Sequence, residues 1–224
     1  MMPRTKEQNE AIREQRKKQI LEAALAVYIE KGYAAAEIGD VAKQSGVARG
    51  LVYYYFKDKL TLFRQLFEHM FSRSRESIHT HFQQPHDSQL ALLKQFADHM
   101  LSQVLETTGT FIFFMRSRHD IMQLYTKEEL RAMNWHGKTL NPLIKAINTG
   151  IEKKEIRSMS PELLASQFWG ALVHAMAGMF EKSRQLRKEG LPQEQIEEAL
   201  KHDLDAAASV CMAMLRPPTM EHGG

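Results

Sequence analysis

The sequence of 224 residues has one cysteine, Cys211, and only twelve glycines and seven prolines. A single cysteine excludes an intramolecular disulfide and fits a reducing compartment. Few glycines and prolines, together with many Ala, Leu, Glu, Gln, Lys and Met residues, favour helix over strand. No run alternates between polar and apolar residues with a period of two. The sequence therefore predicts an all-α protein.

Several signatures of other protein classes are also missing. The first thirty residues carry six positive side chains and no continuous apolar block, unlike a signal peptide. Because no later run approaches eighteen uncharged apolar residues, we expect no membrane span and a cytoplasmic protein. The ten histidines show no metal-ligand spacing, and no phosphate loop, nucleophile elbow or spaced carboxylate pair occurs. We expect no metal, no cofactor and no enzymatic activity.

Positive charge is present in excess only near the amino terminus. Residues 1–59 contain 11 Lys or Arg and 8 Asp or Glu, whereas residues 60–224 contain 19 of each. This asymmetry is typical of a protein with one nucleic-acid-binding end. With 43% hydrophobic residues, the chain can form one large domain or a small domain joined to a larger one.

Apolar residues recur at helical spacing along most of the chain. A first helix is expected from about Ile12 to Gly32, a short second one from Ile38 to Ser45, and a third of about two turns around Val52 and Phe56. Asp58 is expected to cap a longer helix that stops before Pro85. Five further helices are expected at about 88–107, 110–122, 127–152, 161–188 and 193–215, with a kink or break at Asn141-Pro142.

Residues 44–59, QSGVARGLVYYYFKDK, place three tyrosines among cations. Two short helices joined by a glycine-containing turn and packed under a longer helix are the elements of a helix-turn-helix, whose second helix enters the DNA major groove. At the start of that second helix, Arg49 can donate two hydrogen bonds to guanine, and Gly50 lets the backbone approach the duplex. The segment is therefore a candidate DNA-reading element. The alternative is an ordinary amphipathic turn and helix with half-buried tyrosines.

The same helix has a phosphate-binding side. Tyr53 and Tyr54 lie on the side of the helix away from the apolar pair, where a phenol can bond to phosphate, whereas the position of Tyr55 is less well defined. Lys59 lies in the first turn of the next helix, where an anion is favoured. Six basic residues ahead of the segment could also meet the DNA backbone or minor groove, or form a solvated helix face: Arg4, Lys6, Arg13, Arg16, Lys17 and Lys18.

A set of residues between positions 19 and 66 carries a family resemblance. It comprises Ala23-Ala24, Gly32-Tyr33, Ile38 with Val41-Ala42, Gly46-Val47, Gly50, Tyr53-x-Tyr55-Phe56 and Lys59. As a set, it resembles the N-terminal domain of the TetR family of bacterial transcriptional repressors, over about a quarter of the chain. The resemblance implies a homodimer in which some residues face bases and others contact phosphate. The implied DNA-binding set is Ala48, Arg49, Gly50, Leu51, Tyr53, Tyr54, Tyr55 and Lys59.

Three positions depart from the family pattern. Ala36 and Ala48 stand where the family usually has hydroxyl residues, and Gly39 stands where a basic residue is common. Each lost cap should cost about 1 kcal/mol or less, and each change removes a possible phosphate contact. These positions are the best support for one alternative function, a helical protein-interaction adaptor without productive DNA binding. A second alternative is a small-molecule carrier that uses the apolar cavity.

The remainder of the chain resembles no family closely and contains two apolar segments, residues 109–125 and 168–180. Their side chains could line an adaptable pocket for an unknown small-molecule effector, although each could equally be plain core. The predicted ligand-binding residues are Phe111, Phe114, Met115, Arg118, Met122, Trp135, Trp169 and His174. Residues 168–180 and 196–215 could form a four-helix dimer interface, or serve only the core of their own subunit.

The sequence as a whole predicts two domains. A helix-turn-helix domain at 9–60 is joined by a long helix to a helical ligand-binding and dimerisation domain at 61–215. The expected function is that of a ligand-responsive repressor, which binds a palindromic double-stranded DNA operator as a homodimer through residues 37–56.

Overall fold

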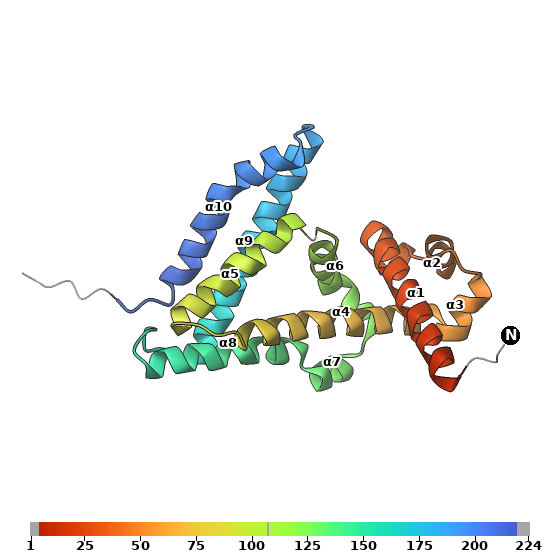
Figure 1. Cartoon of the computed structure of the whole chain (residues 1–224), viewed down its shortest axis with the longest axis horizontal. Helices are drawn as coiled ribbons and strands as arrows, with labels where there is room; N and C mark the ends of the chain where they lie inside the picture. The colour runs from red at the N-terminus through yellow and green to blue at the C-terminus, as the bar shows by residue number, and fades with distance from the viewer. Residues whose placement is uncertain (1–4, 107, 219–224) are drawn as a thin grey trace, which may run out of the picture. The chain divides into compact units, whose positions relative to one another are not determined.

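The computed structural model describes residues 5–106 and 108–218. Those residues form ten α-helices and no strand, which confirms the all-α prediction (Figure 1). The helices are α1 Lys6–Ala35, α2 Ile38–Ser45, α3 Arg49–Phe56, α4 Lys59–Phe82, α5 Gln89–Glu106, α6 Thr108–Leu124, α7 Lys127–Met133, α8 Trp135–Glu152, α9 Pro161–Lys188 and α10 Gln193–Ala213.

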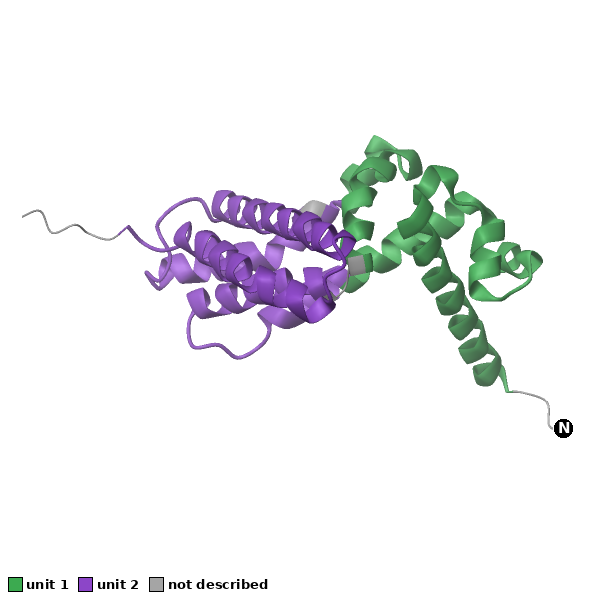
Figure 2. Cartoon of the chain, turned by 90° about the horizontal axis from the view of Figure 1, so that it is seen from above, with its two compact units in different colours: residues 1–73, 109–133 green, residues 74–108, 134–224 purple. Residues whose placement is uncertain are grey.

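The helices form two compact units (Figure 2). Unit 1 comprises residues 1–73 and 109–133, and unit 2 comprises residues 74–108 and 134–224. The sequence predicted a domain boundary near residue 60. Packing instead groups α7 and most of α6 with the amino-terminal helices. Unit 1 therefore holds the candidate reading element together with a segment from the middle of the chain.

The start and end of α1 follow from local chemistry. Thr5 and Gln8 form a capping box, in which the Gln8 amide donates to the Thr5 hydroxyl at 3.2 Å and the Thr5 amide donates to the Gln8 side chain at 3.0 Å. Near the other end, Gly32 has φ 73° and ψ 174°, a backbone conformation that is essentially restricted to glycine. The chain then turns into α2, and Lys31 pairs with Asp40 at 2.8 Å across this turn.

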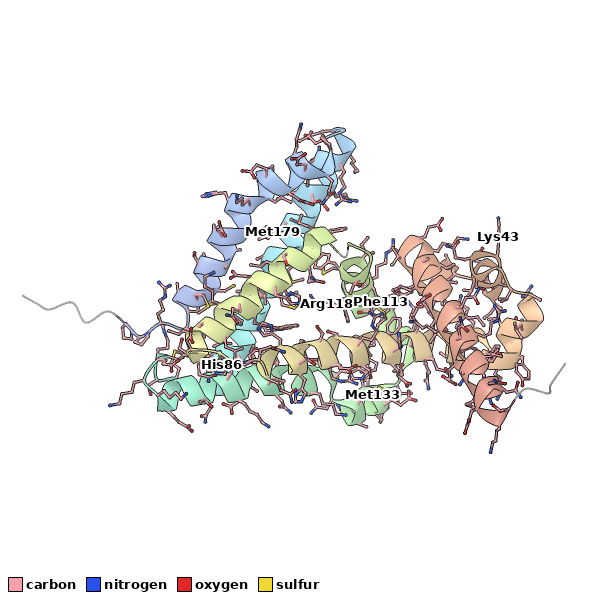
Figure 3. The ribbon with its side chains drawn as sticks, in the orientation of Figure 1. Lys43, His86, Phe113, Arg118, Met133 and Met179 are labelled. Carbon is pink, nitrogen blue, oxygen red and sulfur yellow. The ribbon has the colours of Figure 1, made fainter. Side chains whose placement is uncertain are left out.

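An aromatic cluster forms the core of unit 1. The Tyr28 ring lies 5.4 Å from Phe67 and 5.3 Å from Phe113, measured between ring centroids, and Phe67 lies 4.9 Å from Phe113. Phe63 and Phe113 are completely buried. Figure 3 marks Phe113 on α6. Burial of a large aromatic side chain and edge-to-face ring contacts both stabilise such a core, so residue 113 anchors α6 to α1 and α4.

One expected element was wrong. A single helix at 127–152 was predicted, with a kink or break at Asn141-Pro142, but the chain breaks between α7 and α8 at Asn134, which adopts φ 43° and ψ 46°. Asparagine tolerates this left-handed conformation better than most residues. A Cβ atom at Gly137 would lie 2.6 Å from the Asn134 side-chain oxygen, so a larger residue there would displace that side chain. Pro142 lies inside α8 without ending it.

Unit 2 is a bundle in which α9 packs against α5, α8 and α10, and α5 also packs against α10. Its core includes the fully buried side chains of Leu93, Phe168 and Leu200. Cys211, on α10, is buried as well. Burial raises the pKa of its thiol.

Helix α9 is the one helix of the described chain that is long and apolar enough to cross a membrane, with a window of mean hydropathy 1.3. The expectation that no such segment exists was therefore wrong on composition. Only 33% of that window is buried, and its exposed residues include Leu163, Gly170 and Gly178. A core helix of a soluble protein meets the same test, and one such helix is weak support for a membrane span.

Candidate nucleic-acid interface

The α2 and α3 helices meet through a short turn of defined geometry. Gly46 follows α2 in the left-handed conformation at φ 67°, and its N–H bonds to the carbonyl oxygens of Ala42 and Lys43. The Val47 amide donates to the Ala42 carbonyl at 3.1 Å. The buried Ser45 hydroxyl donates to the Val41 carbonyl at 2.7 Å. This turn fixes the direction in which α3 leaves α2.

The two sides of α3 differ sharply in exposure. Val52 is 0% exposed and Phe56 is 1% exposed, and both face the core of unit 1. Tyr53 is 41% exposed and Tyr54 is 73% exposed. Because large apolar rings are normally buried, a tyrosine pair open to solvent is typical of a binding surface whose hydroxyl groups bond to a polar partner.

The first turn of α3 is open. Ala48, Arg49 and Gly50 are all exposed, and Leu51 is half-buried. The Arg49 guanidinium donates to the Tyr53 hydroxyl one turn later at 3.3 Å and lies 5.7 Å from the centre of that ring. The contact orients Arg49 along α3 and leaves most of its five donors available for base edges.

Further cations surround this exposed turn. Lys43 and Lys57 are exposed, and Figure 3 shows Lys43 projecting outward from α2. Neither residue, nor Arg49, has an ion-pair partner among the described residues. Unpaired surface cations next to an exposed helix end form the electrostatic pattern of a phosphate-backbone contact.

Lys59 is engaged within the protein. Its ammonium group donates to the Ala34 carbonyl at 3.0 Å and lies 5.0 Å from the centre of the Tyr33 ring. At the same helix start, the Asp58 carboxylate accepts from the Thr61 amide at 2.7 Å, which confirms Asp58 as the cap of α4. This bond is the main cause of the lowered pKa of Asp58. The predicted phosphate contact of Lys59 would have to compete with both arrangements.

The three departures from the family pattern lie in different surroundings. Ala36 is fully buried, so a longer side chain there would need space. The Glu37 amide donates to Asp40 at 3.1 Å, which satisfies one donor at the start of α2. A Cβ atom at Gly39 would meet nothing within 4 Å. Ala48 is the N-cap of α3 and supplies no side-chain hydrogen bond.

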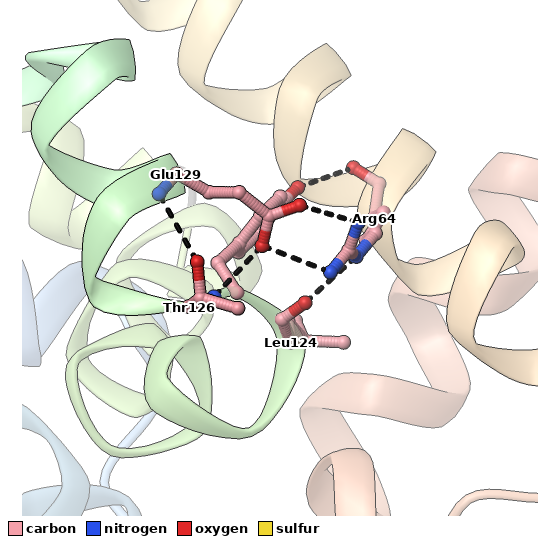
Figure 4. A network of polar contacts seen from close by, with 5 residues as sticks. Arg64, Leu124, Thr126 and Glu129 are labelled. Atoms are coloured by element: carbon pink, nitrogen blue, oxygen red, sulfur yellow. Dashed lines mark hydrogen bonds and ion pairs between the residues drawn. The ribbon is translucent and has the colours of Figure 1, made fainter.

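A polar network joins α4 to the α6–α7 connection within unit 1 (Figure 4). The two terminal nitrogens of Arg64 donate to the two oxygens of Glu129 at 3.0 and 3.1 Å, and its Nε donates to the Leu124 carbonyl at 2.7 Å. Glu129 also accepts from the Thr126 amide at 2.7 Å, and the Tyr125 hydroxyl donates to the Arg64 carbonyl at 3.0 Å. The Thr126 amide and then Arg64 lower the pKa of Glu129. All three Arg64 nitrogens are thus used to hold α7.

A second set of contacts joins α6 to the end of α1. The Asp120 carboxylate accepts weakly from the Tyr33 amide, at 3.4 Å, and lies beside Tyr28. Burial, and then Asp120, raise the pKa of Tyr28. Arg116 reaches the same place, because a Cβ atom at Gly32 would lie 3.3 Å from its Nη1. The four-residue spacing of Arg116 and Asp120 is the sequence signal that both face one side of α6.

The predicted ligand-binding residues are divided between the two units. Five lie on α6 in unit 1, of which Phe111 is buried, whereas Arg118 is exposed and Met122 is 52% exposed. The other three lie in unit 2, where Trp169 stacks on Phe96 with ring centroids 6.3 Å apart and His174 is exposed. None of the eight lines either of the two cavities found in unit 2. Their ligand-binding role therefore stays a prediction.

No group of three or more His, Cys, Asp or Glu side chains that could hold a metal ion occurs among residues 5–106 and 108–218. The residues lining the larger cavity, in unit 2, were not predicted from the sequence. They include Arg75, Lys138 and Lys145. The two lysines stand seven apart on one face of α8, a spacing that becomes informative only once Pro142 is known to leave the helix unbroken.

Comparisons with known proteins agree with this geometry. A family model described as bacterial regulatory proteins, tetR family, matches residues 20–66. The transcriptional regulator AcrR of Shigella flexneri is 41% identical over 49 residues, which are 22% of this chain and 23% of that protein. The fatty acid metabolism regulator protein of Bacillus subtilis is 29% identical over 159 residues, which are 66% of this chain and 75% of that protein. The chain thus aligns with less than a quarter of the first relative and three quarters of the second.

Solved structures share the fold over nearly the whole chain. FadR of Bacillus halodurans, a fatty acid degradation regulator, has a TM-score of 0.67 at 21% identity, covering 93% of this chain and 97% of that one. FadR of Bacillus subtilis, in complex with stearoyl-CoA, has a TM-score of 0.66 at 20% identity, covering 88% and 98%. These relatives are named as regulators and not as enzymes. The amino-terminal residues 20–66 thus match the tetR family of bacterial regulatory proteins, and the chain shares the fold of the solved structures named above.

Proposed function

We propose that the protein is a transcriptional repressor that binds a palindromic DNA operator as a homodimer and is released by a small molecule. The observation that carries this proposal is the asymmetry of α3, which buries Val52 and Phe56 and exposes Arg49, Tyr53 and Tyr54. A helix held from one side with cations and phenols on the other can enter a major groove. Residues 37–56 would form the operator-binding element, and the cytoplasm is where such a protein meets DNA.

Base reading is assigned to the start of α3. Arg49 would bond to guanine, and the exposed Gly50 would allow the backbone to come close to the duplex. Tyr53, Tyr54 and Tyr55 would contact phosphates, with Lys43 and Lys57 adding charge. Lys59 would act on phosphate only after leaving the Ala34 carbonyl.

Dimerisation through α9 and α10 is supported by uncovered surface. On α9, Gly170, His174 and Gly178 are exposed at four-residue intervals, and a Cβ atom at either glycine would meet nothing within 4 Å. On α10, Ala206 and Val210 are exposed, Val210 by 62%. Two such helices from each subunit can pack closely as a four-helix interface. The apolar surface of α9 would then be covered by a second copy of the chain.

The effector is proposed to act by changing the separation of the two reading helices. A dimer on DNA must present its α3 helices about 34 Å apart, one turn of the duplex. A ligand that binds better to a dimer with another spacing weakens operator binding by its differential affinity for the two states. The resemblance to a regulator crystallised with stearoyl-CoA makes an amphipathic acyl compound a reasonable first effector to test.

The test is selection of bound sequences from a random DNA pool, followed by binding measurements on the selected site. We expect a palindromic site, and we expect Arg49→Ala to lose the preference for that site over random DNA by tenfold or more. The control is Tyr54→Phe, which removes one hydroxyl that could donate a hydrogen bond to phosphate. This variant should weaken binding to all DNA sequences to a similar degree. If no sequence is selected and wild-type protein binds DNA no better than Arg49→Ala, the adaptor or carrier alternative replaces the repressor.

A further inference from the structure

Unit 2 contains an open cavity of about 570 Å³. This volume lies within the range of small-molecule sites, about 300–1,000 Å³. One wall is a stripe of α4 that includes Arg75 and His79, and the opposite wall is a stripe of α8 that includes Lys138, Asn141 and Lys145. The α4–α5 connection and the start of α5 close one end. All of these residues belong to the same unit, so their arrangement is defined.

The charge of the cavity has one sign. Arg75, Lys138 and Lys145 line it, and no Asp or Glu is among its lining residues. Neither Lys138 nor Lys145 makes an ion pair or a side-chain hydrogen bond with any part of the chain that the structure describes. The nearby Glu155 carboxylate accepts from the Gln89 amide at 2.6 Å and thereby caps α5. The unpaired Lys138 and Lys145 add positive charge to a cavity without a lining carboxylate, and an anionic ligand would be attracted to them.

The spacing of the cations limits the shape of the anion. Lys138 and Lys145 are seven residues apart on α8, which places them two turns and roughly 10 Å apart along the helix axis. An anion with several charges along its length, such as a diphosphate, can pair with both lysines, and Arg75 supplies a further charge from α4.

The cavity also has an apolar floor. Leu92 is 2% exposed and Ala146 is 7% exposed, and Phe82 and Pro142 lie beside them. The Phe82 ring packs on Phe96 with centroids 5.0 Å apart, so its position is supported from behind. Pro142 has no N–H and cannot bond to the Lys138 carbonyl one turn earlier, which leaves an acceptor for a ligand hydroxyl or amine.

The closed end of the cavity is held by a hydrogen-bonded pair, the buried Gln89 and the exposed His86. Gln89 is 6% exposed, and its Nε2 lies 2.8 Å from Nε2 of His86, whose Nδ1 lies 3.0 Å from the Gln84 carbonyl (Figure 3 marks His86). Because a carbonyl can only accept, the Nδ1 of His86 carries a hydrogen and its Nε2 accepts from Gln89. This chain of bonds orders the α4–α5 connection as a wall of the cavity.

We propose that this cavity binds a small organic molecule that carries a diphosphate or longer phosphate chain next to an apolar or ring-shaped portion. Nucleoside diphosphates and coenzyme A thioesters share this chemistry. The lysines and Arg75 neutralise the phosphates, and the Phe82 side of the cavity covers the ring or apolar portion. The proposed ligand would be the effector of the proposed repressor, and this regulatory role depends on the repressor function. Binding of the ligand to the cavity does not depend on that function.

Isothermal titration calorimetry of the full-length protein tests the site, with ADP, coenzyme A, inorganic pyrophosphate and dodecanoate as probes. We expect ADP and coenzyme A to bind, with affinity that falls as salt is raised. The double variant Lys138→Gln/Lys145→Gln should bind both at least tenfold more weakly. The matched control, Lys188→Gln, removes an exposed lysine at the end of α9 that lines neither cavity and should bind as the wild type does.

Several results would overturn the proposal. The first is that neither ADP nor coenzyme A binds. The second is that the wild type and the double variant bind these probes with equal affinity. The third is that dodecanoate binds as tightly as coenzyme A and that its affinity is unchanged in the double variant. Pyrophosphate should bind more weakly than ADP. Equal affinity would contradict the proposal that the cavity also binds an apolar or ring-shaped portion of the ligand. The single variant Lys145→Gln, checked by its circular dichroism and urea midpoint, guards against a fold defect because Lys145 is exposed.

The same proteins separate this inference from the repressor function. Without ligand, the double variant should bind selected DNA as the wild type does, because both lysines lie outside unit 1. If no operator is found but ADP binding depends on the lysines, the repressor function fails and the cavity assignment stands. If an operator is found but the probes bind independently of the lysines, the cavity assignment fails and the repressor function stands.

Discussion

At the scale of single residues, Ala48 is a position where the chain lacks an expected group. It is the N-cap of α3, has extended backbone angles and provides no side-chain acceptor. Ser at an N-cap accepts from an amide in the first turn, whereas Ala cannot. We expect Ala48→Ser to raise the free energy of unfolding by about 1 kcal/mol.

Urea denaturation followed by circular dichroism measures this change. The control is Ala26→Ser, at an exposed position inside α1, where a helix-interior serine should lower stability by about 0.5 kcal/mol. Stabilisation by both substitutions, or by neither, would show that capping is not the cause. The Ala48→Ser variant should also bind DNA more tightly if its new hydroxyl contacts a phosphate.

Gly32 interrupts α1 shortly before the helix ends at Ala35, with backbone angles that residues carrying a side chain rarely adopt. At φ 73° and ψ 174°, a side chain is strained, and the new Cβ of Gly32→Ala would also lie 3.3 Å from Nη1 of Arg116. We expect Gly32→Ala to lower the free energy of unfolding by about 1–3 kcal/mol. Most of this comes from the backbone, since the tip of an arginine can move.

Gly39→Ala is the matched control for that measurement. Gly39 lies in α2 and has free space around it, so alanine there should stabilise the protein by about 0.5–1 kcal/mol. A Gly32→Ala protein as stable as the wild type would contradict the strain argument. Gly32 could be identified from the sequence as a helix end, but its contact with Arg116 could not, because 84 positions separate the two residues.

At the scale of helices, the Arg64–Glu129 network holds α7 and the α6–α7 connection against α4. The pKa of Glu129 is lowered, first by the Thr126 amide and then by Arg64. A carboxylate with a lowered folded-state pKa stabilises the fold above its unfolded pKa, and this stability is lost as pH falls through the folded value. Its ordinary pKa is 4.5, so the contribution should be complete near neutral pH and disappear under acid conditions.

We therefore expect Glu129→Gln to lower the urea midpoint at pH 7 and to approach the wild type as pH falls from about 4.5 towards 3. Urea titrations across this range measure the difference between the two proteins. The neighbouring exposed residue gives a control, Glu128→Gln, which removes a carboxylate that has no hydrogen bond or ion pair from Arg64. A gap between wild type and Glu129→Gln that stays constant with pH would contradict the ionic origin.

Sequence patterns predicted the helices well but not all of their junctions. Apolar spacing, Gly46 and Asp58 predicted α2, α3 and the start of α4, because each signal acts through its nearest neighbours. The break at Asn134 was missed because proline is the stronger local breaker, yet Pro142 is accommodated inside α8. The opposing walls of the unit 2 cavity come from α4 and α8, and helical periodicity does not state which helices become neighbours.

At the scale of the whole molecule, the uncovered faces of α9 and α10 give the clearest test of assembly. Val210 is 62% exposed on α10, and a charge placed there would be buried in a dimer without a partner. We expect Val210→Asp to convert the dimer to a monomer in analytical ultracentrifugation, with little change in helix content. It should also lose operator affinity, since a palindrome is bound by two subunits.

The control is Lys201→Asp, an exposed position that lies nine residues away and so on the opposite side of α10. It makes a larger change in charge and should leave the dimer intact. Dissociation by Lys201→Asp, or a dimer that survives Val210→Asp, would place the interface elsewhere. Which residues α3 buries and which it exposes could be predicted from helical spacing, whereas the dimer interface was predicted only as one of two uses for the same apolar helices.

The buried sulfur of α10 has a practical consequence. Cys211 is the protein's one thiol, it is 1% exposed, and burial raises its pKa, so little thiolate exists to react and reagents cannot reach it in the closed bundle. Modification by a maleimide must then wait for α10 to lift away. The rate at which a maleimide labels the unaltered protein therefore reports how often α10 opens. Compounds or DNA that stabilise the bundle should slow this labelling.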